Sequence, residues 1–74
     1  MIAKRLIDLR EERNLKQKDL AVLLNIQQAA YSKYETGRVN VPTDNLAKIA
    51  DFYEVNIEYL MGRTNVRNPI FDSE

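Results

Sequence analysis

The feature that most constrains this chain is a pair of short amphipathic helices, predicted between Gln17 and Glu35 and joined by a very short turn. Each helix places three residues on one inward face, namely Leu20, Ala21 and Leu24 in the first and Ala30, Tyr31 and Tyr34 in the second. Asn25 lies between them. Because asparagine tolerates the left-handed conformation that commonly ends a helix, the chain can reverse there without a long loop. Asn14 is predicted to end a preceding helix, residues 2–13, in the same conformation.

The second helix leaves a small polar face outside. At about 100° per residue, the residues that cluster opposite its tyrosines are Gln28, Ala29, Ser32, Lys33 and Thr36. An ordinary solvated face would usually mix Glu and Lys and would not need a fixed turn before it. Amide, hydroxyl and ammonium groups are those that meet base edges in the major groove of DNA. The pattern therefore favours groove reading by residues 28–36.

Further residues and short motifs extend this pattern over residues 2–63. They are Ile2, Leu6, Leu9 and Arg10; Leu15-x-Gln17-x-x-Leu20-Ala21; Leu24-Asn25-Ile26; Tyr31-Ser32-Lys33-Tyr34-Glu35-Thr36-Gly37-Arg38; Pro42; Leu46-x-x-Ile49-Ala50-Asp51; and Val55-Asn56-Ile57-x-Tyr59-Leu60-x-Gly62-Arg63. In order and spacing they resemble the Cro/phage-repressor type helix-turn-helix domain, also called the xenobiotic-response-element type. The resemblance implies an all-α, lambda-repressor-like bundle of five helices over residues 1–63, followed by a short tail at 64–74.

Composition agrees with one small domain. The chain has 74 residues and no Cys or His, which excludes disulfides and the usual zinc sites and removes the usual proton shuttle. We expect no metal, no cofactor, no small-molecule ligand and no enzymatic activity, since no nucleophile and base are paired. The longest apolar run, Leu20 to Leu24, is far too short for a membrane span, so we expect a cytoplasmic protein associated with the nucleoid.

Charge is distributed unevenly although the formal net charge is zero. Residues 1–40 carry eight basic and five acidic side chains, a net of +3, whereas residues 41–74 carry three and six, a net of −3. The half that contains the helix pair is thus the basic half, as expected if that surface faces phosphate.

Base-reading residues are predicted on the outer face of the second helix, at Gln28, Ala29, Ser32 and Lys33. Glutamine can bond adenine through two hydrogen bonds, worth roughly 1–3 kcal/mol of discrimination, and an alanine methyl can meet the methyl of thymine. Lys33 could read guanine or hold a phosphate, and both roles stay open. Tyr31 and Tyr34 are assigned to the core.

Phosphate contacts are predicted beside this face. The resemblance assigns one to Gln17, at a helix start where free N–H groups and the helix dipole favour an anion. Lys16, Thr36, Arg38 and Asn40 complete the predicted set. Lys16 and Gln27 stand where a Ser or Thr cap is commoner, a loss of about 1 kcal/mol at Lys16.

Two pairings follow from the resemblance. Arg10 is expected to form a structural ion pair with Glu35, with a phosphate contact as the alternative role for Arg10. The last helix and the turn before it are expected to form the seam of a homodimer that binds a near-palindromic operator in double-stranded DNA. The candidate seam residues are Glu54, Val55, Ile57, Glu58, Tyr59 and Met61, with Ile70 and Phe71 of the tail.

Several alternatives remain open at this point. Ile70 and Phe71 could pack back on the bundle, join the dimer seam or begin a longer protein.

Thr43 and Asn56 are predicted to cap the fourth and fifth helices. The most direct function is a transcriptional repressor of phage, plasmid or bacterial origin. The rival is a protein-interaction module such as an antitoxin, which the zero net charge, Ile7, Val22 and the tail favour.

Overall fold

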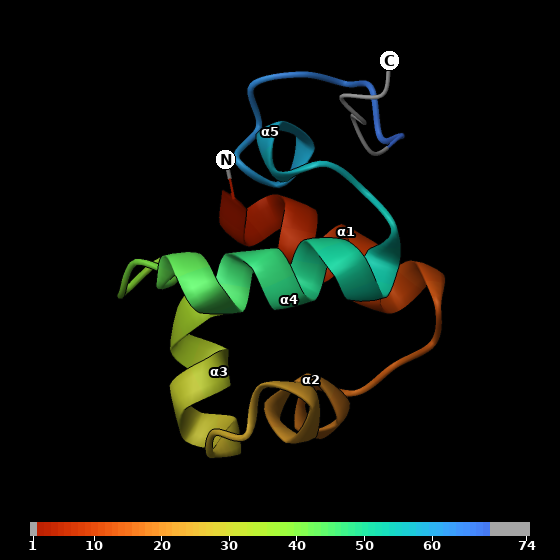
Figure 1. Cartoon of the computed structure of the whole chain (residues 1–74). Helices are drawn as coiled ribbons and strands as arrows, with labels where there is room; N and C mark the ends of the chain where they lie inside the picture. Colours follow the sequence, from red (N-terminus) through yellow and green to blue (C-terminus); the bar gives the residue numbers. More distant parts are fainter. Residues whose placement is uncertain (1, 69–74) are drawn as a thin grey trace.

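The computed structural model describes residues 2–68, and its regular elements are five helices (Figure 1). They are α1 (Ile2–Glu12), α2 (Gln17–Leu24), α3 (Gln28–Glu35), α4 (Thr43–Tyr53) and α5 (Ile57–Leu60). In Figure 1, α4 crosses the middle of the molecule, with α1 and α5 above it and the α2–α3 pair below. The five-helix architecture predicted from the sequence is confirmed.

One core joins all five helices. Its largest fully buried side chains come one from each helix, namely Leu6, Leu20, Tyr31, Ile49 and Leu60. Each such residue gains roughly 1.5–3 kcal/mol from burial if it is an aliphatic side chain. A short helix such as α5 is not stable alone, so this shared core holds it in place.

The turns between helices use residues with positive φ. Asn14 and Asn25 adopt the left-handed conformation, with φ of 56° and 57°, as the sequence predicted. Glu54 does so as well, with φ of 57°, which the sequence did not predict. This conformation costs a residue other than Gly, Asn or Asp about 1–2 kcal/mol. It accompanies the two hydrogen bonds that end α4, from the Glu54 N–H to the Asp51 carbonyl at 3.2 Å and from the Val55 N–H to the Ala50 carbonyl at 3.0 Å.

Two helix starts differ from the expected capping. Pro42, not Thr43, occupies the N-cap of α4, because the helix already includes Thr43, and the predicted Thr43 cap is wrong. At α2, Lys16 makes no side-chain cap, but the Asp19 carboxylate accepts a hydrogen bond from the Lys16 backbone N–H at 2.8 Å. Asp19 thereby supplies from inside the helix part of what a Ser or Thr cap would supply.

Candidate nucleic-acid interface

The turn between α2 and α3 is built by two backbone hydrogen bonds. The N–H of Asn25 donates to the carbonyl of Val22 at 3.1 Å, and the N–H of Ile26 donates to that of Ala21 at 3.0 Å. This is the Schellman pattern of a helix end, and the left-handed Asn25 makes it possible. Ala21 is only 4% exposed, and its small side chain lets the two helices approach closely.

The inner face of α3 is fixed by its two tyrosines. Tyr31 and Tyr34 are both buried and meet edge to face, with ring centroids 5.9 Å apart. The Tyr34 hydroxyl accepts a hydrogen bond from Asn45 of α4 at 3.1 Å. Burial is the main reason that the pKa of Tyr31 is raised, so this hydroxyl stays neutral.

The outer face of α3 is open to solvent. Gln28, Ala29 and Lys33 are exposed, and Ser32 is half-buried. Thr36 ends the helix, and its hydroxyl donates to the Lys33 carbonyl at 3.2 Å. The structure thus brings the four predicted base-reading residues together on one face, as their helical spacing required.

A polar network locks the end of α3 to the two preceding helices. Arg10 of α1 donates from Nε to Glu35 Oε2 at 2.8 Å and from Nη2 to Oε1 at 3.1 Å. Its Nη1 donates to the carbonyl of Leu15 at 3.0 Å. Gln17, at the start of α2, donates from Nε2 to Glu35 Oε1 at 3.1 Å. The structure therefore contains the expected Arg10–Glu35 ion pair, and Gln17 joins it, which the sequence did not predict.

This network settles the charge of Glu35. The Glu35 side chain is only 3% exposed, and burial alone would raise its pKa. The contact with Arg10, followed by smaller contributions from Tyr31 and Gln17, outweighs that effect and lowers the pKa below its ordinary value, so the carboxylate is ionised at neutral pH. The negative charge of Glu35 is buried and paired with the positive charge of Arg10, so it adds no negative charge to the surface of α3.

The unengaged cations gather on the helix pair. Within residues 2–68, four exposed cations of this region form no ion pair, namely Lys16, Lys18, Lys33 and Arg38. Lys48 of α4 is a further cation of this kind. By contrast, Arg13 donates to the carbonyls of Phe52 and Tyr53 at 3.2 Å each and so caps the end of α4. Along residues 16–38 these four cations accompany one exposed carboxylate, that of Asp19, so this stretch of the chain is mainly cationic.

The loop after α3 begins with a left-handed glycine. Gly37 has φ of +77°, and an added Cβ would meet no atom within 4 Å, so the backbone conformation alone explains the glycine. Arg38 and Asn40 are exposed beyond it, whereas Val41 is buried. Both predicted phosphate-contacting residues of the loop are thus on the surface.

The candidate dimer seam needs correction at two positions. Val55 and Tyr59 are only 5% and 4% exposed, because both pack into the core of this chain, which leaves little of either side chain for a partner. Glu54, Ile57, Glu58 and Met61 are exposed. Ile70 and Phe71 lie outside the described residues.

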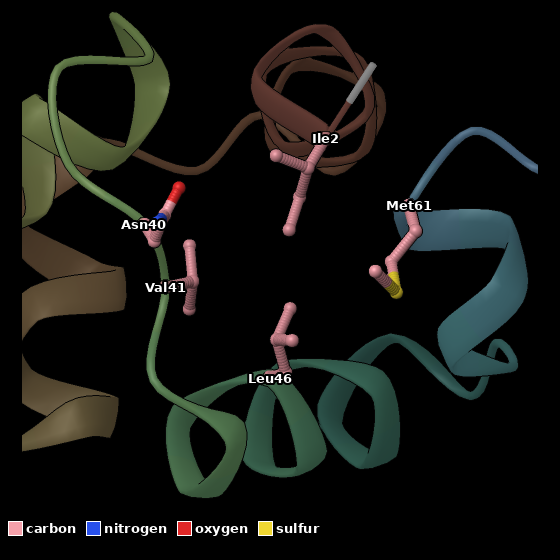
Figure 2. Close-up of a pocket in the computed structure, with 5 residues that line it drawn as sticks. All are labelled: Ile2, Asn40, Val41, Leu46 and Met61. Carbon is pink, nitrogen blue, oxygen red and sulfur yellow. The ribbon is translucent and has the colours of Figure 1, made fainter.

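An open pocket of about 220 Å³ adjoins Met61. Figure 2 shows Ile2, Val41, Leu46 and Met61 directed toward a common space, with Asn40 at its edge. Its walls come from α1, the loop before α4, α4 itself and the end of α5. Asn40 is therefore shared between this pocket and the set of predicted phosphate contacts.

No group of three or more metal-ligating side chains occurs within residues 2–68. None of the helices α1 to α5 is long and apolar enough to cross a membrane.

Comparison with known proteins gives one consistent picture. The helix-turn-helix family model matches residues 6–60. The HTH-type transcriptional regulator YobD of Bacillus subtilis (strain 168) is 32% identical over 69 residues, which cover 93% of this chain and 62% of YobD. For ImmR of the same organism, also an HTH-type transcriptional regulator, identity is 35% over 65 residues, with coverage of 88% and 51%.

A phage protein and a solved structure extend the comparison. The cryptic phage CTXphi transcriptional repressor RstR of Vibrio cholerae serotype O1 is 39% identical over 62 residues, covering 84% of this chain and 55% of RstR. A crystal structure of a transcriptional regulator from Listeria innocua superposes with a TM-score of 0.83 at 25% identity, over 99% of this chain and 65% of that one. The chain spans less than two thirds of each of these four proteins. The resemblance seen in the sequence is thereby confirmed, and the chain belongs to the helix-turn-helix family, of the Cro and phage-repressor type.

Proposed function

We propose that this chain binds duplex DNA sequence-specifically, with α3 in the major groove, and represses transcription by occupying an operator. The observation that carries the proposal is the outer face of α3, which is free of carboxylates, is held rigidly by α2 and the Arg10–Glu35–Gln17 network, and lies beside unengaged cations. The names of the relatives support the same function, and one of them is a phage repressor. A regulator of phage, plasmid or bacterial origin acting in the cytoplasm, on the nucleoid, fits these names.

The base-reading roles follow from exposure. Gln28 and Ala29 are exposed at the start of α3, where Gln28 would pair with adenine and Ala29 would meet a thymine methyl. Ser32 and Lys33 lie one turn further on, with Ser32 half-buried and restricted to bases that come close. Lys33 has a long free side chain and takes either a guanine or a phosphate.

The phosphate roles follow from donors that remain free. The Gln17 amide nitrogen carries two N–H groups and spends one on Glu35, which leaves the other for a phosphate oxygen. Because Glu35 fixes the amide, Gln17 would meet the phosphate without losing side-chain freedom on binding. Lys16, Thr36, Arg38 and Asn40 extend the contact along the backbone on either side of α3.

Binding as a homodimer completes the proposal. Ile57 and Met61 are each 36% exposed, lie four residues apart across α5, and Met61 borders the apolar pocket of Figure 2. A two-fold contact through this face would place two copies of α3 on half-sites about 34 Å apart in a near-palindromic operator.

A second candidate function is a partner-docking module of the same fold, such as an antitoxin. It is favoured by Val22, an apolar side chain that is 80% exposed on the outer face of α2. An apolar side chain makes no favourable contact with a DNA phosphate, whereas a protein partner would bury it. Under this alternative, DNA binding is secondary.

The deciding experiment is selection from a pool of random duplexes, followed by sequencing of the retained DNA and anisotropy titrations at two salt concentrations. We expect a near-palindromic sequence and a log–log salt slope of about −0.9 for each phosphate contacted. Failure to enrich any sequence at either salt concentration would transfer the assignment to the partner-docking module.

A further inference from the structure

The chain after α5 is not a free tail over residues 64–68. This segment, here called the strap, is the last part of the blue trace that passes over α5 in Figure 1. It lies outside residues 6–60, which the family model matches, and the ordered structure therefore continues past the predicted domain end at Arg63.

Asn56 ties the strap to α5. Its side-chain Nδ2 donates to the carbonyls of Val66 and Asn68 at 2.8 Å each, and its backbone N–H donates to the carbonyl of Arg67 at 3.0 Å. Its Oδ1 accepts from the backbone N–H of Tyr59 at 2.6 Å and so caps α5. Asn56, the N-cap of α5, thus donates both side-chain amide protons to the strap, and these bonds orient the side chain whose oxygen caps the helix. For a helix of a single turn, this cap fixes where the helix begins, in addition to the core contacts that hold it.

Two arginines tie the strap to α1. Arg67 of the strap donates through Nη1 to Glu12 Oε1 at 2.7 Å, through Nη2 to Glu12 Oε2, and through Nε to the Tyr59 hydroxyl at 3.0 Å. Arg5 of α1 donates from Nη2 to Asn65 Oδ1 at 2.9 Å. The two guanidinium carbons lie 4.0 Å (Arg5) and 5.2 Å (Arg67) from the centroid of the Tyr59 ring, which suits cation–π attraction.

These contacts meet at α5, whose outer face carries the proposed dimer seam. Tyr59, the residue between the two arginines, lies within α5, and Ile57 follows Asn56 directly. Moving the strap would therefore move both the start and the middle of a one-turn helix. The exposed side chains of Ile57 and Met61 would move with it, because they flank the same turn.

We propose that Arg67 is a positioning residue for dimerisation: by clamping the strap to Glu12 and Tyr59 it holds α5 in the orientation that two copies need on a two-fold operator. This inference rests on the proposed function. Arg67 acts through Asn56, Tyr59 and α5 and takes no part in reading DNA. Loss of the clamp should weaken pairing of the two copies while leaving each copy's recognition helix intact.

The test compares a full palindromic site with a single half-site, both taken from the selected sequences. Arg67→Ala should weaken full-site binding about tenfold, because charged hydrogen bonds are lost but the ion pair is about half exposed, and should change half-site binding less than about twofold. Glu12→Gln should act in the same direction. Arg67→Lys should fail to restore wild-type binding, since an ammonium cannot reproduce the two parallel hydrogen bonds from Nη1 and Nη2 to the two oxygens of Glu12.

Lys48→Ala is the matched control, because Lys48 is an exposed cation of α4 without an ion pair in the described structure and its removal costs the same charge. It should leave full-site binding unchanged. Equal weakening of both sites by Arg67→Ala, wild-type behaviour of that variant, or full rescue by lysine would each overturn the inference.

A second arm keeps the inference separate from the proposed function. Sedimentation equilibrium without DNA should show weaker self-association for Arg67→Ala than for the wild type, with circular dichroism showing that both are folded. If the wild type binds no DNA yet dimerises through a contact that Arg67→Ala weakens, the proposed function fails and the positioning role stands. If the wild type is monomeric and binds no DNA, or if Arg67→Ala self-associates as tightly as the wild type, the positioning role fails.

Discussion

Replacing Glu35 by alanine should destabilise the domain more than its single side chain suggests. The substitution leaves the Arg10 guanidinium, only 16% exposed, with one remaining hydrogen bond to the Leu15 carbonyl. Breaking a buried pair by removing one partner costs about 3–5 kcal/mol. The retained bond places Arg10 at the lower end, about 3 kcal/mol, which for a domain of this size lowers the Tm by roughly 12–24 °C. This is a large share of the total stability expected of so small a domain.

Thermal and urea unfolding followed by circular dichroism measure this effect. The matched control is Glu58→Ala, which also removes a glutamate from an arginine pair, because the Arg63–Glu58 pair is long at 3.5 Å and both side chains are well exposed, at 62% and 48%. Exposed pairs contribute about 0–1 kcal/mol, so the control should lose only a few degrees. If Glu35→Ala loses no more than Glu58→Ala, the network does not hold the three helices together and the reasoning is refuted.

Three further predictions follow from particular groups. The pKa of Glu35 is lowered in the folded state, so the stability that its carboxylate contributes is present above the ordinary pKa of 4.5 and is lost as the pH falls through the folded pKa. Urea unfolding at neutral and at strongly acidic pH should therefore show that the difference in unfolding free energy between wild type and Glu35→Ala shrinks in acid. A difference that stays constant with pH would contradict this. Gln28→Ala should lower the affinity for the selected sequence by roughly 1–3 kcal/mol and leave the affinity for other sequences unchanged. Arg38→Ala should lower the affinity for all sequences and reduce the salt slope by about 1. If both variants change the affinity for every duplex alike in anisotropy titrations, Gln28 does not read a base. Gly37→Ala should cost about 1 kcal/mol, or about 4–8 °C in Tm, from its positive φ alone, and an unchanged melting curve would show that the loop relaxes without strain.

The sequence predicted the features that depend on local signals. Helical spacing placed Leu20, Leu24 and Tyr31 in the core, and the asparagines at 14 and 25 marked left-handed helix ends. In each case the signal lies within a few residues of its consequence. The Arg10–Glu35 pair is different, since its partners are 25 residues apart and only the family resemblance pointed to it.

The features that were missed depend on contacts between distant segments. The left-handed conformation of Glu54 has no signal in its residue type, because neither glycine nor asparagine stands there; it lies between Tyr53 and Val55, which are both buried among distant segments. Val55 and Tyr59 were predicted at a dimer seam, but one helical turn is too short for periodicity to separate an inner face from an outer one. The Arg67–Glu12 contact joins residues 55 positions apart, so no local sequence pattern predicts it.

The structure separates the side chains that hold α3 in place from those that α3 exposes to solvent. Tyr31, Tyr34 and Glu35 carry the contacts that fix the helix, and they all lie on its inner side. Among the described residues, the side chains of Gln28, Ser32 and Lys33 form no hydrogen bond and no ion pair. A change on the outer side therefore removes no contact on which the fold depends. One scaffold can in this way hold different sets of outward-facing side chains on α3, and under the proposed function the operator preference would change without loss of stability.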